Sequence, residues 1–486
     1  MKRLDGHKLS ILVFSFYFSW LLAFLYEGRV LYKIAERYQI EVHTIVFSIM
    51  IFHFLGLCIC GFWIKTIKNA KSFLIISIIS CILGSVFFFF PPTLLWNMTA
   101  ALMAFMTGGA VAAWGYFYKQ FTPAGNRMST AADVLMGSNL LMIMINIVAV
   151  NLHDYMGFAL SIAMLLIALY LAVCLPTEIN TELESNTEAE IKKEILVRTG
   201  HLKRPLTLLY IFIMIITINA GLMYQVIMPA FAAHRLLVSW YWAIPYITVL
   251  YLMKHFSQHK NRAYTLYIAI AMIGFCFIMF MILDRSAISF VIINTLMLGA
   301  CGIYDLFWWS ILGEMIELDK NPAKIMGIGL SANVLGVFAG GILGKTIVIL
   351  NIQAHYISLL AFGVILITFM LLPLLHKELL EIIRNRSYLS EGERGDLAER
   401  KENEKDQKTT DKITSDIFKE FMLTDRECEI AELLLNGRTY KMIAAELFLS
   451  ENTVKTHIKN IYSKLQVSNK TELIYLYQKN KTHNHP

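Results

Sequence analysis

Charged residues are scarce in this sequence. Only 16% of its 486 residues are Asp, Glu, Lys or Arg. Soluble globular chains carry about 25%. Hydrophobic residues make up 57% of the chain, and the mean hydropathy is +0.56. This balance excludes an ordinary soluble enzyme and indicates that most of the chain lies in lipid.

Motifs of common enzymes and metal sites are also missing. The sequence has no nucleophile triad, P-loop or dinucleotide fingerprint, which predicts that the protein is not an enzyme. It has no C-x-x-C motif or Cys/His cluster, so we expect no metal, no disulfide framework and no cofactor. The seven cysteines are scattered, at Cys58, Cys60, Cys81, Cys174, Cys276, Cys301 and Cys428.

Apolar runs make up most of the first 380 residues. Each of twelve runs is long enough to cross a hydrocarbon core of roughly 30 Å. They cover residues 11–25, 42–63, 73–90, 94–116, 131–150, 155–175, 206–230, 236–253, 264–282, 287–312, 326–350 and 357–375. We therefore predict an all-α polytopic membrane bundle over residues 1–380, in contact with membrane lipid.

The twelve predicted spans form two sets of six, separated by a polar loop at residues 176–204. The two sets share a basic cluster, which lies at residues 65–71 in the first set and at 254–262 in the second. Such parallel halves resemble the major facilitator fold, which implies a two-lobed, transporter-like body. The resemblance is architectural, since the acidic residue that this family carries after its second span is absent between Gly61 and Lys71.

Basic residues indicate how the body is oriented. The loops expected in the cytoplasm carry Lys65, Lys68, Lys71, Lys119, Arg127, Lys192, Lys193, Arg198, Lys203, Arg204, Lys254, Lys260, Arg262, Lys320 and Lys324, and the opposite loops carry Arg29, Lys33, Arg37, Arg235 and Arg285. Cytoplasmic loops are enriched in Lys and Arg. We therefore expect a multi-pass protein of the inner (cytoplasmic) membrane with both termini in the cytoplasm.

Polar residues within the spans are the candidates for a ligand site, because polar groups in lipid are costly unless they have a role. These candidates are His53, Asn146, Asn219 and Asn294. A lone His in an aromatic bundle serves more often as an interhelical hydrogen-bonding partner than as a proton relay. Binding of a small-molecule ligand and simple helix packing both remain open for these residues.

The composition changes abruptly after the last span. Residues 381–418 are rich in charged residues and poor in apolar ones, so they predict a charged, flexible linker that cannot form a core. Helical patterns return at residues 419–486. There, Thr424 and Glu427 have the spacing of a capping box, and Ser450 is an expected N-cap.

The helix after Ser450 is expected to have two different faces. Four apolar residues recur at helical spacing and should face the other helices. They are Val454, Ile458, Ile461 and Leu465. Between Asn452 and Thr471 the sequence has four lysines and no acidic residue. A positive ridge of this kind suits DNA phosphate, although a lysine stripe can also be a solvated helix face.

This stretch resembles the LuxR-type helix-turn-helix domain. The family pattern is L-T-x-R-E, a mid-domain Gly, I-A-x-x-L, S-x-x-T-V-K-x-H and N-I-x-x-K-L, and it is matched at residues 423–427, 437, 443–447, 450–457 and 460–465. The resemblance implies a small four-helix domain whose recognition helix, residues 453–465, lies in the major groove of double-stranded DNA. One departure is Asn469, where the family usually has Arg.

The resemblance also implies which residues contact DNA. They are Asn452, Thr453, Lys455, Thr456, Lys459, Asn460 and Lys464. Lys455, Thr456 and Lys459 would reach base edges. Lys464 would touch phosphate, with its side chain off the packed face. Because so small a domain makes few phosphate contacts, we expect a homodimer on DNA. The candidate dimer face consists of Leu473, Leu476 and Tyr477.

Two functions follow from these patterns. The first is a membrane-embedded transcription regulator whose transporter-like body acts as a sensor and controls a cytoplasmic LuxR-type output. The alternative is a functional solute transporter that carries an accessory DNA-binding tail. Solute flux in vesicles would favour the transporter, and a change in reporter output on truncation of the body would favour the sensor.

Overall fold

The chain divides into two compact units, Met1–Leu380 and Glu381–Pro486, which we call the body and the module. The computed structural model describes residues 5–26, 28–40, 42–177, 203–256, 262–350, 356–378, 423–435, 438–447, 449–470, 472–473 and 476. Most of the predicted loop at 176–204 and all of the predicted linker at 381–418 lie outside the described residues.

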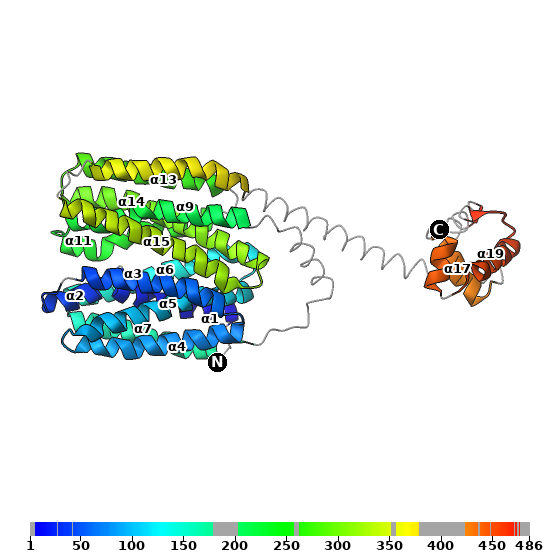
Figure 1. The fold of residues 1–486 in the computed structure, drawn as a ribbon, viewed down its shortest axis with the longest axis horizontal. Coiled ribbons are helices and arrows are strands. Elements are labelled where there is room, and N and C mark those ends of the chain that lie inside the picture. Colours follow the sequence, from blue (N-terminus) through cyan, green and yellow to red (C-terminus); the bar gives the residue numbers. More distant parts are fainter. Residues whose placement is uncertain are drawn as a thin grey trace. The chain divides into compact units, whose positions relative to one another are not determined.

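The first half of the body is built from long helices and one short helix, α2. Its elements are α1 (Gly6–Trp20), the π-helical turn η1 (Leu21–Tyr26), α2 (Val30–Arg37), α3 (His43–Trp63), α4 (Ile67–Val86), η2 (Phe87–Phe89), α5 (Leu94–Phe121), η3 (Ala124–Asn126), α6 (Arg127–Asn151) and α7 (Asp154–Cys174). The long helices lie side by side in Figure 1, in blue to cyan. Helix α2 falls between two predicted spans and was not expected from the sequence.

The second half repeats this arrangement in green to yellow (Figure 1). Its elements are α9 (Lys203–Leu222), η6 (Met223–Ile227), α10 (Met228–Ala230), α11 (Arg235–Trp240), η7 (Tyr241–Ala243), α12 (Ile244–Phe256), α13 (Arg262–Ile282), α14 (Ala287–Met315), η8 (Ile316–Leu318) and α15 (Pro322–Ile349). A last helix spans Tyr356–Glu378.

Eleven helices among the described residues are long and apolar enough to cross a membrane. The predicted span at 236–253 is not one of them, because the 3-10 turn η7 divides it into α11 and α12. Pro245 lies at the start of α12 and has no N–H to continue the α-helical hydrogen bonding. The predicted all-α membrane bundle is confirmed, and its count of twelve spans is approximate.

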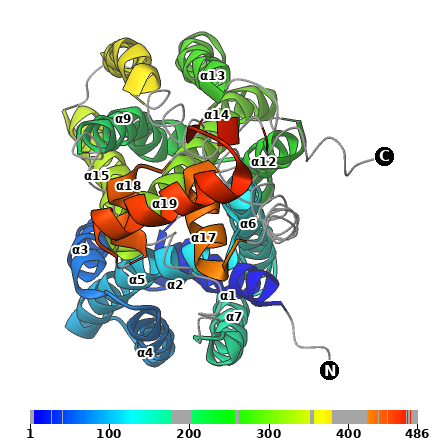
Figure 2. The ribbon, with the colours of Figure 1, turned by 90° about the vertical axis from the view of Figure 1, so that its right-hand side faces the viewer.

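The two halves meet mainly at α15 of the second half and α6 of the first. Helix α15 of the second half packs against α3 and α5 of the first, and α6 of the first half packs against α12 and α14. Figure 2, which views the body along its helices, shows the blue-to-cyan half beside the green-to-yellow half. Within the second half, α15 packs closely on α9, since a Cβ at Gly336 would lie 2.1 Å from the Met214 carbonyl oxygen.

One end of the body carries polar contacts that connect the halves. We call this set the inter-half joint, and it comprises Arg127 with Glu317, Lys254 with Asp133, Lys119 with the Ile316 and Asp319 carbonyls, and Asn321 with the Gly61 carbonyl. The Lys254 Nζ to Asp133 Oδ1 distance is 2.5 Å, and Asn321 Nδ2 lies 3.0 Å from the Gly61 oxygen. Arg127 is only 2% exposed.

The module is a small helical unit of α17 (Asp425–Leu435), α18 (Tyr440–Glu446) and α19 (Glu451–Leu465), followed by a partly described helical segment. Its core contains Leu423, Cys428, Ile430, Ala431, Leu434, Ile443, Ala444, Val454, Ile458, Ile461, Leu465 and Leu473. The four apolar residues predicted to face inward on α19 are all in this core, so that prediction is confirmed.

Candidate nucleic-acid interface

A capping box starts the first helix of the module. The Thr424 backbone N–H donates to Glu427 Oε2 at 2.9 Å, and the Glu427 N–H donates to Thr424 Oγ1 at 3.3 Å. This reciprocal pair satisfies backbone donors that the first turn of α17 would otherwise leave open. The predicted capping box is confirmed.

The turn between α18 and α19 has a defined geometry. Arg426 of α17 donates from Nη2 to the Leu447 carbonyl oxygen at 2.7 Å, and the Leu449 N–H donates to the Ala444 oxygen at 2.9 Å. Ser450 then accepts the Thr453 N–H at 3.1 Å, which confirms it as the N-cap of α19. These contacts set the angle at which α19 leaves the turn.

Helix α19 has one buried and one open face. Val454, Ile458, Ile461 and Leu465 are at most 4% exposed. The seven predicted DNA-contacting residues occupy exposed positions, and they are Asn452, Thr453, Lys455, Thr456, Lys459, Asn460 and Lys464. Among the described residues, Lys455 and Lys459 take part in no ion pair or hydrogen bond. Both ammonium groups are therefore open to an external anion.

Lys464 differs from the other two lysines. Its Nζ lies 2.7 Å from Glu427 Oε2, and the Glu427 side chain is only 5% exposed. Lys464 lies at an exposed position, off the apolar face, but its ammonium also neutralises a buried carboxylate, which was not predicted from the sequence. Sequence spacing missed this contact because 37 residues separate the partners. The sequence did offer one indication of this contact. Glu427 and Lys464, an acid and a base, each lie in a motif segment that is otherwise rich in core residues.

The same contacts set the acidity of Glu427. Burial raises the pKa of its carboxyl, but the hydrogen bonds from Lys464 and from Thr424 outweigh that effect. The pKa of Glu427 consequently lies below its usual value. Helix α17 and the end of α19 are thus joined by a carboxylate that stays ionised at neutral pH.

The candidate dimer face is changed by the structure. Leu473 is fully buried in the core of the module, and Leu476 is partly buried against that core. The expectation that Leu473 faces a partner is wrong, because its side chain completes the packing of its own module. Tyr477 lies outside the described residues.

The candidate ligand residues of the body lie on four different helices. His53 is on α3, Asn146 on α6, Asn219 on α9 and Asn294 on α14, and each is at most 5% exposed. His53 Nδ1 lies 3.0 Å from Thr107 Oγ1, as expected of an interhelical hydrogen-bonding residue. Asn146 Oδ1 accepts the Arg29 backbone N–H at 3.0 Å.

The module matches a family of known proteins. Residues 422–477 match the family described as bacterial regulatory proteins, luxR family. The spore germination protein GerE of Bacillus subtilis (strain 168) is 47% identical over 53 residues, which are 11% of this chain and 72% of GerE. The chain belongs to the LuxR family. The resemblance that the sequence pattern indicated is thereby confirmed, and the module is a LuxR-type regulator domain.

Two further relatives match this chain over a similarly short stretch. The transcriptional regulatory protein LiaR of B. subtilis (strain 168) is 56% identical over 50 residues, 10% of this chain and 24% of LiaR. The uncharacterized transcriptional regulatory protein YhcZ of the same strain is 46% identical over 54 residues, 11% of this chain and 25% of YhcZ. The chain thus spans about a quarter of the length of these two regulators.

The body resembles a solved transporter structure. The human organic anion transporter MFSD10 matches 76% of this chain over 98% of its own length, with a TM-score of 0.55 and 13% sequence identity. At this identity the likeness concerns the fold. The predicted two-lobed, transporter-like body is confirmed, and the LuxR module follows it in the same chain.

Proposed function

We propose that this protein is a membrane-embedded transcription regulator in which the transporter-like body is a sensor and the LuxR module is its cytoplasmic output. The observation that carries the DNA-binding half of this proposal is the division of α19 into a buried apolar face and an open face with Lys455 and Lys459. Exposed ammonium groups on a helix that is fixed by its opposite face can neutralise phosphates and reach base edges in the major groove.

The proposed roles along α19 follow from position and bonding. Lys455, Thr456 and Lys459 are proposed to contact base edges, with Asn452, Thr453 and Asn460 beside them. Lys464 is proposed to hold Glu427 first and to add to the positive field near phosphate. We further propose that two modules bind adjacent half-sites, because a single module of this size makes few phosphate contacts.

The sensor half of the proposal rests on the division of the body into two halves. The halves are connected by the inter-half joint at one end, so a ligand that changes the contact between them would have a defined element to act on. His53, Asn146, Asn219 and Asn294 remain the proposed polar residues of the transmembrane interior. We place the body in the inner membrane, surrounded by lipid, with both termini in the cytoplasm.

A second candidate function is supported by the fold itself. A body that shares the fold of a transporter over most of its length can be a working solute transporter with an accessory DNA-binding tail. The two candidates differ in what loss of the body does. A sensor changes transcription when the body is removed, whereas an independent transporter changes solute flux and leaves transcription as it was.

The experiment starts with chromatin pull-down of the full-length protein, which identifies the bound promoters. A reporter on one such promoter is then measured with the full chain, with the module alone and with a Lys455→Ala/Lys459→Ala double variant of the full chain. We expect loss of binding in the double variant and altered, unregulated output from the module alone. Equal output with and without the body, together with solute uptake by vesicles, would replace the sensor with the transporter.

A further inference from the structure

One face of helix α2 packs against the rest of the body, and the opposite face lines a cavity. Val30, Leu31, Ile34 and Ala35 are buried against the body. Tyr32, Lys33 and Glu36 of α2, together with Arg29 just before the helix, line the cavity. An eight-residue helix divided in this way serves as a wall, because its apolar stripe fixes it while its polar stripe stays open.

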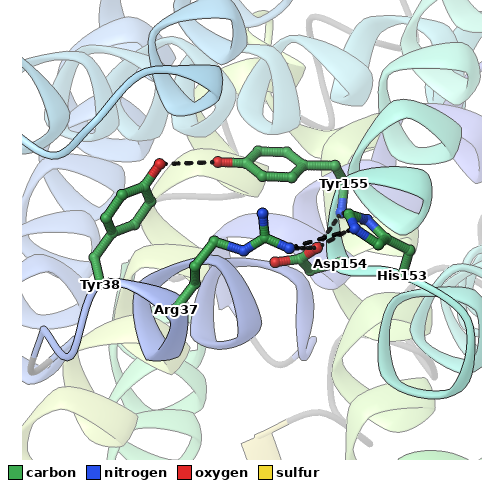
Figure 3. A network of polar contacts seen from close by, with 5 residues as sticks. All are labelled: Arg37, Tyr38, His153, Asp154 and Tyr155. Carbon is green, nitrogen blue, oxygen red and sulfur yellow. Dashed lines mark hydrogen bonds and ion pairs between the residues drawn. The ribbon is translucent and has the colours of Figure 1, made fainter.

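Polar contacts hold the end of α2 in place (Figure 3). Arg37 Nη2 lies 2.8 Å from Asp154 Oδ1 at the start of α7, and the Arg37 guanidinium lies over the Tyr155 ring at 4.8 Å from its centroid. The Tyr38 and Tyr155 hydroxyls are 3.3 Å apart. His153 also contacts Asp154, at 2.9 Å. The wall formed by α2 is therefore preorganised, which lowers the cost of binding a ligand against it.

The cavity has a volume of about 620 Å³ and receives side chains from both halves of the body. Small-molecule sites commonly measure about 300–1,000 Å³. Its lining residues outside α2 and its cap are Gln39, Ile40, Val42 and Val150 of the first half and Ala232, Val238 and Ser239 of the second. Val150 lies near the end of α6, whereas Arg127 of the inter-half joint begins the same helix. The cavity and the joint therefore lie at opposite ends of α6.

Among the described residues, those that line the cavity carry one more positive charge than negative. Lys33 Nζ and Glu36 Oε2 form an ion pair at 2.7 Å. Arg29 forms no ion pair among the described residues, and its backbone N–H is held by Asn146. The described lining residues thus include two cationic groups and one anionic group, a net charge of +1. A half-buried guanidinium beside apolar side chains is a strong hydrogen-bonding partner for a carboxylate.

We propose that this cavity binds a small organic anion, with its carboxylate on Arg29 and its apolar part against Ile40, Val42 and Val238. The inference rests on the proposed sensor function, because it names the class of signal that the body would detect. A ligand that contacts both halves at the cavity end stabilises the conformation in which the two halves lie close together at that end. Binding therefore shifts the equilibrium between conformations of the body.

The test measures binding to the purified full-length protein in detergent by equilibrium dialysis. The probes are 2-naphthoate and 2-naphthamide, which have the same apolar rings and differ in charge. We expect 2-naphthoate to bind at least about tenfold more tightly than 2-naphthamide, because a hydrogen bond to a charged group adds that much affinity. Equal affinity of the two probes, or no binding of either, would overturn the proposal.

Variants then locate the site. Arg29→Gln should weaken 2-naphthoate binding about tenfold to a hundredfold and leave 2-naphthamide unchanged. Arg285→Gln is the matched control, since Arg285 precedes α14 at the same end, where His234 contacts its carbonyl oxygen, and does not line the cavity. Equal losses in the two variants would mean that general charge attraction, and no site at Arg29, holds the anion.

Two further changes keep the test decisive if Arg29→Gln folds poorly. Ala232→Trp should block binding by filling the cavity from the second half, while Ala233→Trp, at the next exposed residue outside the lining, should not. Glu36→Gln should tighten 2-naphthoate binding about two- to fivefold by removing the one acidic residue among the described lining residues. Binding that passes these tests without any effect on the reporter would support the anion site and refute the sensor function.

Discussion

The body and the module each contain a buried charged side chain whose partner lies far along the chain. In the body it is the cation Arg127, 2% exposed, which pairs with Glu317 at a separation of 190 residues. In the module it is the anion Glu427, 5% exposed, which pairs with Lys464 at a separation of 37 residues. In both pairs the other member is only partly exposed.

The two pairs connect different kinds of parts. Arg127 also donates to the Tyr118 and Lys119 carbonyl oxygens, so it ties the end of α5 to η8 across the two halves. Glu427 closes a capping box and ties α17 to α19 inside one core. A buried charge that loses its partner is costly wherever it lies. Breaking the first pair should therefore loosen one half from the other, whereas breaking the second should loosen a single core.

The largest effect is expected at Glu317. Glu317→Gln removes the anion from Arg127 and should destabilise the body by about 3 kcal/mol, because the guanidinium stays buried without the Glu317 carboxylate. Tryptophan-fluorescence melting of the full chain in detergent measures the change. Glu36→Gln is the control, since it breaks the more exposed Lys33–Glu36 pair and should cost less than about 1 kcal/mol. Equal melting temperatures for the two variants would show that burial of Arg127 carries no special cost.

The matching change in the module is Lys464→Met. It should lower the free energy of unfolding of a fragment covering residues 417–486 by about 2 kcal/mol, less than at Glu317 because the capping box still holds Glu427. Urea unfolding measures this change, with Lys459→Met as a control that should leave stability nearly unchanged. If both variants lose the same stability, the Lys464–Glu427 contact is not what stabilises the core.

The pH dependence of the fragment gives a second measure of this pair. The pKa of Glu427 in the folded module is lowered, so its contribution is present above the unfolded pKa of about 4.3 and is lost as the pH falls through the folded pKa. Wild-type stability should therefore fall below roughly pH 4.5. In Lys464→Met the folded pKa moves back up, so this fall should be smaller. An unchanged pH profile would contradict the role given to Lys464.

The same comparison shows what sequence patterns can and cannot predict. Caps and core faces depend on residues three to eleven positions apart, which is why Thr424 with Glu427, Ser450, and the apolar face of α19 were all predicted correctly. Pairing of Glu427 with Lys464 and burial of Leu473 depend on how helices pack, and local spacing contains no information about that packing.

In the body, the composition predicted helices and halves but not the features that interrupt or join them. Pro245 could have indicated the break between α11 and α12. However, a Pro near the middle of an apolar run is also common in membrane-spanning helices, so it did not distinguish a break from a continuous span. Helix α2 is only eight residues long, too short to span a membrane, and it contains Lys33, Glu36 and Arg37, so the sequence indicated a loop there. The cavity beside it requires residues from both halves, which no single stretch reveals.

The open lysines of α19 contrast with the paired Lys464 and predict a different kind of loss. Lys459→Ala should weaken binding to a cognate operator by about 1–3 kcal/mol and weaken binding to random DNA less, because a base contact carries sequence information. Lys464→Ala should weaken both about equally and also lower stability. Titration of each variant on operator and random DNA at two salt concentrations separates these outcomes. A loss at Lys459 that is equal on both DNAs would demote it to a phosphate contact.

The smallest effect concerns a feature that body and module share. Gln39 after α2 and Gln466 after α19 both have positive φ, 55° and 54°. In each case the next residue donates back to the helix, Ile40 to the Ala35 oxygen and Val467 to the Tyr462 oxygen. This is a helix ending at which Gly is usual, because a side chain in the left-handed region costs roughly 1–2 kcal/mol.

Gln466→Gly should therefore stabilise the module fragment by about 0.5–1 kcal/mol. This figure is the backbone strain that Gly relieves minus the cost of the extra conformational freedom that Gly gives the unfolded chain. Ser463→Gly, within α19, should have the opposite sign, with a loss of about 0.5 kcal/mol. Urea unfolding resolves both changes. If Gln466→Gly destabilised the fragment instead, the Gln466 side chain would have to contribute more than its backbone strain costs. Positive φ at Gln39 would then not imply the same strain energy as positive φ at Gln466, although the two helix ends have the same backbone geometry.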